Sequence, residues 1–260
     1  TLLAIAEMIK GGITCFNDMY FFPNIVVKTA VEAGMRASVG LIVLDFPSIW
    51  ASNADEYIAK GIEVHDSVKN QSLISSMFAP HAPYTVSDAP LKRIMTLAEE
   101  LDLPIHMHVH ETAHEVAESE KNTGQRPLAR LASLGLLSPR LAAVHMTQLN
   151  AEDLQLIKNS GLSIVHCPES NLKLASGMFP AQKIKSLEIN MALGTDGAAS
   201  NNDLDMFGEM RTAALLAKAV AADAQALPAY EVIRMATLGG AKALGLDQLI
   251  GSIELGKAAD

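Results

Sequence analysis

Two kinds of segment alternate along all 260 residues, and this alternation constrains the fold more than any other feature. Short apolar or β-branched runs are followed by longer stretches in which apolar residues recur at spacings of three and four. Repeated units of this kind predict a parallel sheet with right-handed crossovers, either closed as a (β/α)8 barrel or open as a doubly wound sheet. The expected strands are seven: 13–20, 36–43, 73–79, 105–110, 141–146, 162–167 and 189–195.

A helical pattern follows each expected strand. These helices cover 23–33, 54–68, 89–101, 127–134, 151–160, 180–186, 204–220 and 230–244, and a further amphipathic helix covers 1–10. Three of them have an expected cap, namely Ser87 or Asp88, Asn150, and Asn202 or Asp203. An eight-stranded barrel needs one strand more, so we expect an α/β TIM-type barrel whose first strand lies upstream of Thr1.

The composition is that of a globular protein and excludes several kinds of partner. With 29 acidic against 20 basic residues the net charge is −9, which argues against nucleic acid. The longest apolar runs, such as 41–44, are far shorter than the ~20 residues of a membrane span. Cys15 and Cys167 are the only cysteines, which indicates a reducing compartment. We expect one cytoplasmic domain over 1–260, with no signal peptide before the first helix.

Polar side chains gather where the expected strands end. In (β/α)8 barrels the chemistry sits at the carboxyl ends of the strands. Imidazoles and one carboxylate that converge there are ligands for Zn²⁺, and Fe²⁺, Mn²⁺ or Ni²⁺ accept the same donors. The sequence therefore predicts a metal site at the barrel mouth. The residues at these ends are His81, His106, His108, His110, Glu111, His145, His166 and Asp196.

The expected strand 105–110 carries histidines at alternate positions. A two-residue period places His106, His108 and His110 on one face and the apolar residues between them on the other. Because the apolar set must face the helices, the three histidines point into the barrel at different depths. His106 lies deepest, so periodicity leaves either His108 or His110 as the metal ligand.

The ordered motifs on five successive strand ends resemble the metal-dependent amidohydrolase superfamily. The likeness is to the branch that deaminates 5′-methylthioadenosine and S-adenosylhomocysteine, which is related to the chlorotriazine hydrolases. The matching stretches extend over nearly the whole chain: GITCFNDMY at 12–20, PHAPY at 80–84, HVHET at 108–112, VH at 144–145, HCPESNLKL at 166–174 and GTDGAASNN at 194–202.

This resemblance implies a role for each residue of the site. The His-x-x-Glu pattern of the family selects His108 as a metal ligand and Glu111 as the catalytic acid/base residue, which also contacts the substrate. Asp196 is implied to be the second metal ligand, a substrate contact and the catalytic proton acceptor. His145 is implied to be catalytic, beside the attacking water, and His81 to bind the substrate.

The remaining polar residues near the strand ends receive supporting roles. His110 is left as a pocket-wall residue and His106 as packing. His166 is expected only to satisfy backbone groups at its strand end. The pair 170–171 and the loop 200–202 are expected to brace the metal site through hydrogen bonds.

The implied reaction is hydrolytic deamination at C6 of an adenine nucleoside by a metal-activated hydroxide, giving the inosine analogue and ammonia. The family draws two further zinc ligands from a His-x-His on its first strand, and no such pair precedes Ile13. A catalytic zinc normally has at least three protein ligands. We therefore expect the 260-residue chain alone to bind its one zinc weakly and to be inactive. Residues 253–260 resemble the point where the family enters a small flanking β-sandwich, which we expect to lie outside the chain.

Two other functions remain open from the residues. A hydrolase of another heterocycle, such as a chlorotriazine or guanine, would use the same metal site and differ only in its specificity residues. A barrel fragment without activity is the second alternative, and the intact set of His108, Glu111, His145 and Asp196 argues against it. The expected partner is a small-molecule nucleoside, without nucleic acid or membrane, and the chain is expected to form a homo-oligomer.

Overall fold

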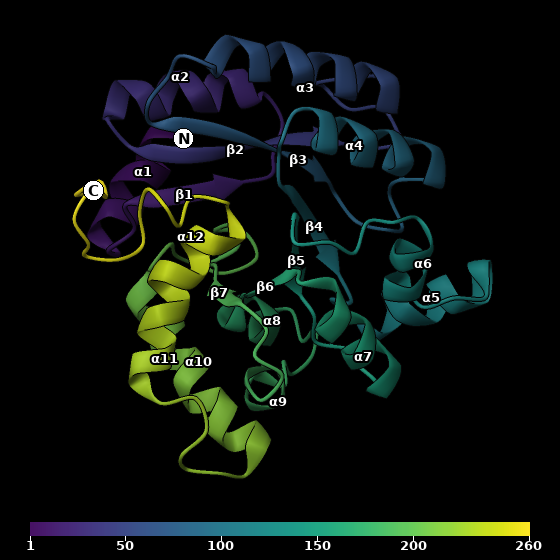
Figure 1. The fold of residues 1–260 in the computed structure, drawn as a ribbon, viewed down its shortest axis with the longest axis vertical. Helices are drawn as coiled ribbons and strands as arrows, with labels where there is room; N and C mark the ends of the chain where they lie inside the picture. Colours follow the sequence, from purple (N-terminus) through teal and green to yellow (C-terminus); the bar gives the residue numbers. More distant parts are fainter.

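One curled sheet of parallel strands forms the centre of the molecule (Figure 1). The structure, a computed structural model, describes all residues from 1 to 260. Each strand pairs with the next one along the chain, in the order β1-β2-β3-β4-β5-β6-β7, and this α/β TIM-type arrangement confirms the seven expected strands. Their bounds are β1 Cys15–Asp18, β2 Arg36–Val43, β3 Ile74–Pro80, β4 Ile105–Val109, β5 Leu141–His145, β6 Ser163–His166 and β7 Met191–Leu193.

Helices connect consecutive strands and cover the outer face of the sheet (Figure 1). The connection after each strand is long enough to cross over, as a parallel sheet requires. The helices are α1 Leu2–Lys10, α2 Pro23–Ala33, α3 Ala54–Val68, α4 Asp88–Glu100, α5 Ala113–Thr123, α6 Pro127–Ser133, α7 Ala151–Ser160, α8 Pro168–Lys173, α9 Ala181–Lys185, α10 Met206–Ala221, α11 Ala229–Arg234, the π-helix η1 Met235–Gly239 and α12 Gly240–Ala243.

Asparagine or aspartate side chains cap the amino ends of three of these helices, α3, α7 and α10. At α7, Asn150 Oδ1 accepts from the Asp153 backbone N–H at 2.8 Å while Asp153 Oδ2 accepts from the Asn150 N–H at 2.9 Å, a reciprocal capping box. This confirms the expected cap. At α10 the cap is Asp205, whose carboxylate accepts from the Phe207 N–H at 2.9 Å. The expected caps Asn202 and Asp203 are wrong.

The loop before α10 is held by a lysine, which explains the later start of that helix. Lys173 Nζ donates to the Ala199 carbonyl at 2.9 Å and to Asn202 Oδ1 at 2.7 Å. It also donates to the Asn201 carbonyl. Because these oxygens are bound from outside, the segment stays a loop until Asp205.

Two helices, α5 and α8, lie outside the helical patterns of the sequence. The segment of α5 has a polar composition with few apolar positions, so its periodicity is weak, and the six residues of α8 are too few to show a period. The expected helix 230–244 is present, but it contains the π-helical turn η1. Gly239 at the end of that turn contacts β7 so closely that a Cβ would lie 2.1 Å from the Met191 carbonyl oxygen. Only glycine fits there.

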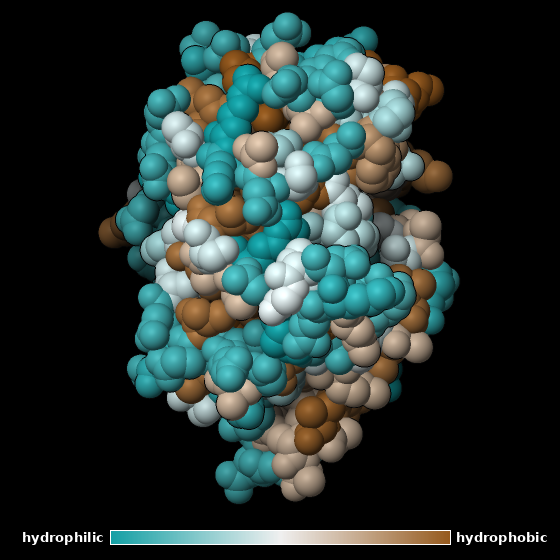
Figure 2. Space-filling model, turned by 90° about the vertical axis from the view of Figure 1, so that its right-hand side faces the viewer, coloured by the Kyte–Doolittle hydropathy of each residue, from teal (hydrophilic) through white to brown (hydrophobic).

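The main apolar core lies between the sheet and its helices. One cluster of 39 buried residues includes the apolar residues of β4 together with side chains of α3, α4 and α6. Polar residues dominate the molecular surface on the side shown in Figure 2, and its apolar side chains form small separate patches. None of the helices combines the length and the apolar character needed to cross a membrane.

Candidate functional site

Three histidine rings lie side by side at the carboxyl ends of β3, β4 and β5. The ring centroids of His81 and His108 are 5.0 Å apart, and those of His108 and His145 are 5.4 Å apart and nearly parallel. These three residues come from different βα units, and the parallel sheet brings their ends to one edge. The structure therefore assembles three of the predicted site residues.

A backbone carbonyl fixes the orientation of the His108 ring. Nδ1 of His108 lies 2.9 Å from the His81 carbonyl oxygen, which can only accept, so Nδ1 carries the proton. The Nε2 lone pair is then free to coordinate a cation. A hydrogen bond of this kind behind the ring is the usual support of a metal-binding histidine.

Glu111 and His145 face one another. Oε2 of Glu111 lies 3.8 Å from Nε2 of His145, and Oε1 accepts from the Ser176 hydroxyl at 3.1 Å. On its other side, His145 Nδ1 lies 2.8 Å from Asn171 Oδ1, which accepts its proton. Nε2 of His145 is then directed toward the Glu111 carboxyl.

Asp196 follows β7 in a left-handed backbone conformation, with φ 60°. Its Oδ2 accepts from the Ser170 hydroxyl at 2.7 Å and its Oδ1 from the Gly197 N–H at 2.7 Å. Ser170 and Asn171, which adjoin in α8, thus hold one site residue each through the expected hydrogen bonds, while their support of a metal stays a prediction. In the loop 200–202, Asn201 Nδ2 donates to the Thr195 carbonyl at 2.9 Å and braces the residue before Asp196.

Burial favours the neutral form of three histidines of this region, His81, His106 and His108. It lowers the pKa of His108 well below its ordinary value, and the neighbouring His106 and His145 charges act in the same direction. Burial also lowers the pKa of His81, and it lowers that of His106 to about 4. A neutral imidazole is the form that binds metal.

The donors present fit a divalent metal in type and fall short of a complete site in number. His108 Nε2 and the Asp196 carboxylate are an imidazole and a carboxylate, as zinc prefers. No group of three or more His, Cys, Asp or Glu side chains lies close enough to hold a metal ion. The two ligands that the family resemblance implies, His108 and Asp196, would be fewer than the three protein ligands that a catalytic zinc normally takes.

The structure corrects the interpretation of His110. The chain turns at this residue, with φ 54°, so the alternation of the strand stops before it. The side chain is fully buried between α6 and α7, where Nδ1 lies 3.0 Å from the Gln148 carbonyl oxygen and Nε2 accepts from the Leu128 N–H at 3.1 Å. The His110 ring thus links the turn before α7 to the first turn of α6, and it does not line a pocket wall.

Two other histidines lie inside the molecule without a partner at Nδ1. His166 stacks against Phe179 at a centroid distance of 4.6 Å, and its Nδ1 has no hydrogen-bond partner. The expectation that it satisfies backbone groups is therefore wrong. His106 Nδ1 is also unpartnered, and its ring lies 5.5 Å from that of His108, as a residue packed beneath the site would.

Two buried glutamates near the site were not identified from the sequence. Glu115, the third residue of α5, accepts from the backbone N–H groups of His110 and Glu111 at 3.1 and 2.7 Å. Glu209 of α10 accepts from Asn201 Nδ2 at 2.5 Å. Burial raises the pKa of Glu115 to about 7 and that of Glu209 to about 8. The weak sequence signal was a Thr-x-x-Glu capping pattern at 112–115.

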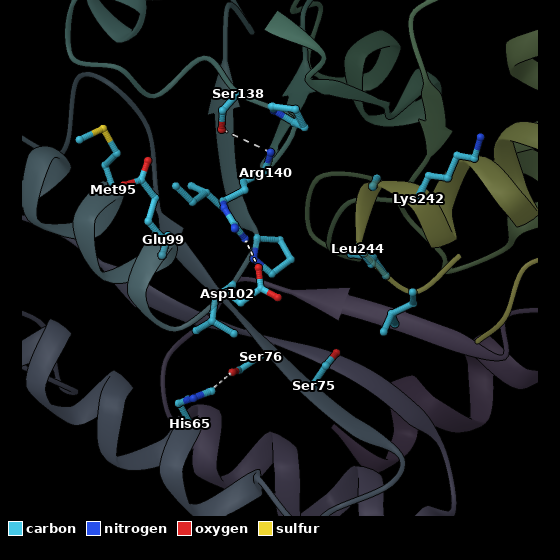
Figure 3. Close-up of a pocket in the computed structure, with 18 of the residues that line it drawn as sticks. His65, Ser75, Ser76, Met95, Glu99, Asp102, Ser138, Arg140, Lys242 and Leu244 are labelled. Atoms are coloured by element: carbon cyan, nitrogen blue, oxygen red, sulfur yellow. Dashed lines mark hydrogen bonds and ion pairs between the residues drawn. The ribbon is translucent and has the colours of Figure 1, made fainter. Parts of the chain in front are cut away.

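A pocket of about 700 Å³ lies at the opposite end of the sheet, beneath the amino ends of β3 and β4 (Figure 3). Arg140 and Asp102 form an ion pair there at 2.7 Å, and His65 Nδ1 lies 2.8 Å from the Ser76 hydroxyl. None of the predicted site residues lines this pocket. We place the candidate site at the carboxyl end because the imidazoles and carboxylates converge there.

The fold and the position of these side chains define the class of TIM-type barrel proteins with a site at the carboxyl ends of the strands. Comparison with known proteins narrows this class. The chain belongs to the amidohydrolase family, whose model matches residues 1–260.

Three similar proteins show how far the likeness extends. A 5-methylthioadenosine/S-adenosylhomocysteine deaminase of Saccharophagus degradans is 55% identical over 260 residues, which are 100% of this chain and 58% of that protein. The crystal structure of an adenosine deaminase from Xanthomonas campestris with bound zinc is 58% identical, with a TM-score of 0.97 over 99% of this chain and 59% of that one. A triazine hydrolase from Arthrobacter aurescens, 23% identical, shares the fold with a TM-score of 0.92 over 100% of this chain and 61% of its own. The chain thus spans about three fifths of the length of these proteins.

Proposed function

We propose that the whole protein is a zinc-dependent deaminase of adenine nucleosides, with 5′-methylthioadenosine and S-adenosylhomocysteine as substrates. The observation that carries this proposal is the pairing of Glu111 with His145 beside the oriented ring of His108. A relative that is 55% identical along the whole chain and bears the name of that activity supports the choice of substrate.

In the proposed site, His108 and Asp196 would hold the metal. We expect its remaining ligands from the part of the relatives' length that this chain does not cover. When bound, a divalent metal lowers the pKa of a coordinated water toward ~7. The residues of this chain then bind the purine and move the protons.

The reaction needs one proton to leave the attacking water and one to reach the purine. Asp196 accepts the proton of the water as its oxygen bonds to C6. Glu111 donates a proton to N1, the ring nitrogen next to that carbon. As the C6–N6 bond breaks, the departing amine takes the proton held by Asp196 and leaves as ammonia. The hydroxyl at C6 returns its proton to Glu111 and becomes the carbonyl group of the inosine analogue, so both carboxyl groups regain their starting state. Positioned acid/base groups of this kind typically contribute about 10²–10⁴-fold to a rate.

Two histidines complete the proposed site. His145 Nε2 lies on the side of the Glu111 carboxyl and would hold the tetrahedral centre that develops at C6. The His81 ring lies edge-on to Tyr84 at a centroid distance of 6.0 Å, and its Nδ1 is 3.0 Å from the Thr85 hydroxyl. This leaves Nε2 of His81 to contact the substrate.

Ammonia release from the two nucleosides tests the proposal. The whole protein, reconstituted with zinc, should release ammonia from both, and Asp196→Asn should abolish the release. Asp203→Asn, the same change at an exposed position of the same loop, is the matched control and should behave like the parent.

A negative result would separate the substrate from the site. If neither nucleoside yields ammonia while zinc stays bound, the nucleoside assignment is wrong. Guanine and a chlorotriazine, included in the same assay, would then identify a hydrolase of another heterocycle. At present only the shared fold speaks for that alternative.

A further inference from the structure

Glu115 is the third residue of α5, as Asp153 is of α7, but the two side chains bind different backbone groups. In α7 the third residue, Asp153, accepts from the N–H of its own cap residue, Asn150. In α5 the cap is Thr112, whose hydroxyl accepts from the Glu115 N–H at 3.1 Å. The Glu115 carboxylate does not return to Thr112. It reaches one and two residues further back, to Glu111 and His110.

The backbone turn at His110 makes this longer reach effective. With φ 54° at His110, the two consecutive N–H groups of His110 and Glu111 point to one carboxylate, as in the nests that bind anions. Each carboxylate oxygen of Glu115 accepts one of them, at 3.1 and 2.7 Å. Glu115 is only 7% exposed, so water does not compete for these bonds.

Glu111 is therefore held at both of its backbone polar groups, the N–H and the carbonyl oxygen. Glu115 holds its N–H, and the Thr147 hydroxyl donates to its carbonyl oxygen at 2.7 Å. Its side chain is left to bond Ser176 and to face His145. A buried carboxylate in this place costs desolvation free energy, which the raised pKa of Glu115 reflects. Capping of α5 does not require a buried carboxylate, because the Thr112 hydroxyl already caps this helix.

We propose that Glu115 is a positioning residue, whose carboxylate holds the backbone of His110 and Glu111 so that the Glu111 carboxyl faces His145. This inference rests on the proposed function, since it assigns the effect to the proton transfer by Glu111. Glu115 touches neither the substrate nor the proposed metal ligands. Its influence on the reaction passes entirely through Glu111.

Kinetics of the whole zinc-loaded protein test this proposal. Glutamine keeps the shape of Glu115 but places an NH₂ group against one of the two N–H donors. Glu115→Gln should therefore lower kcat for ammonia release by about 10²-fold, the usual effect of a small misplacement. KM and zinc content should stay unchanged. If kcat is retained, the proposal is wrong.

Two control variants separate positioning from helix stability. Thr112→Ala removes the cap and should lower the melting temperature while kcat stays near that of the parent. Glu118→Gln makes the same chemical change on the solvent side of α5, where Glu118 pairs with Lys121, and should change neither. If Thr112→Ala lowers kcat as far as Glu115→Gln does, Glu115 is only a cap.

A double variant tests the route of the effect. If Glu115 acts through Glu111, then Glu115→Gln should cause no further loss of kcat in a Glu111→Gln background. Additive losses would overturn the proposal. Should Glu115→Gln fail to fold, Glu115→Asp answers the same question, because it keeps the charge and is too short to reach both donors.

Amide hydrogen exchange decides the structural part without any substrate. Glu115→Gln should raise the exchange rate of the peptide 108–112, and Glu118→Gln should not. The parent protein could lack deaminase activity while exchange still rises in Glu115→Gln only. In that case the proposed function is wrong, and the conclusion that Glu115 holds the backbone of His110 and Glu111 remains valid. If the exchange rate of this peptide is unchanged in Glu115→Gln, the proposal that Glu115 holds this backbone is wrong.

Discussion

The two ends of the sheet differ in how they treat polar groups. At the carboxyl end, histidines and carboxylates are buried, and four residues adopt a left-handed backbone: His110, His145, Met146 and Asp196. At the amino end, a wide pocket is lined by groups that pair near the surface, such as Arg140 with Asp102, whose side chain is 85% exposed.

This difference teaches that the volume of a pocket and the place of the chemistry are separate properties. Left-handed conformations of residues other than glycine cost about 1–3 kcal/mol each and persist only where the surroundings impose them. Buried titratable groups with shifted pKa values also concentrate at functional sites. Both signs are more frequent at the carboxyl end. The lining of the amino-end pocket has one such backbone conformation, at Asp102, and one histidine with a lowered pKa, His65. Four predictions sharpen the contrast, in order of expected effect.

The largest effect is expected for Asp196→Asn in the whole protein. This change removes a proposed metal ligand together with the proposed proton acceptor, so ammonia release from 5′-methylthioadenosine should fall by at least about 10³-fold. Metal analysis of the purified variant should show reduced zinc. An active variant with full zinc would remove Asp196 from the site.

Glu111→Gln should come next. The side chain is not a proposed metal ligand, so zinc should stay bound while kcat falls by about 10²–10⁴-fold. Steady-state kinetics and metal analysis on the same preparation check this, with Glu118→Gln as the matched control. Loss of zinc along with activity would show that Glu111 supports the metal rather than the proton transfer.

Glu209→Gln should change how stability depends on pH. The folded pKa of Glu209, about 8, lies above its ordinary value of 4.5 because the carboxyl is buried. The unfolded chain therefore loses this proton first, and the group makes folding less favourable as pH rises from about 4.5 to 8. The slope is at most about 1.4 kcal/mol per pH unit.

The variant lacks this titrating group. The difference in urea midpoint, variant minus parent, should therefore increase as the pH rises from 5 to 8. Glu100→Gln, the same change at an exposed residue at the end of α4, is the control and should leave the slope unchanged. A parent and variant with parallel pH profiles would show that Glu209 does not carry the shift.

The smallest effect is expected at the amino end. Arg140→Ala breaks the ion pair with Asp102. The Arg140 side chain is 36% exposed and the Asp102 side chain 85% exposed, so solvent screens this pair. Such pairs contribute about 0–1 kcal/mol to stability. The free energy of unfolding measured in urea should therefore fall by no more than about 1 kcal/mol, and the rate of ammonia release should not change. A large loss of activity would mean that the pocket in Figure 3 is coupled to the reaction.

The sheet was predictable from the sequence because each strand has its own run of apolar residues. The run 36–43 is buried along its whole length and appears as β2 with the expected bounds. The same signal failed for α5, whose stability comes from the Thr112 cap and a few buried contacts rather than from an apolar stripe. Local periodicity does not record such contacts.

The positions of the site residues were predictable in part. Strand-end placement brought His81, His108 and His145 together, as expected. The alternation rule failed at His110, because a left-handed residue ends the strand and sends that ring toward α6 and α7. The role of Glu115 depends on the same turn. It could not be derived from spacing, which assumes that the chain stays extended.

The open sides of the sheet have a consequence for handling the 260-residue chain alone. β1 and β7 each pair with one neighbour, so one row of N–H and C=O groups on each strand has no strand beside it. Such edges are templates for pairing with another molecule and promote aggregation. Self-association of the isolated chain would therefore report strand addition at these edges, and subunit assembly has to be measured on the whole protein.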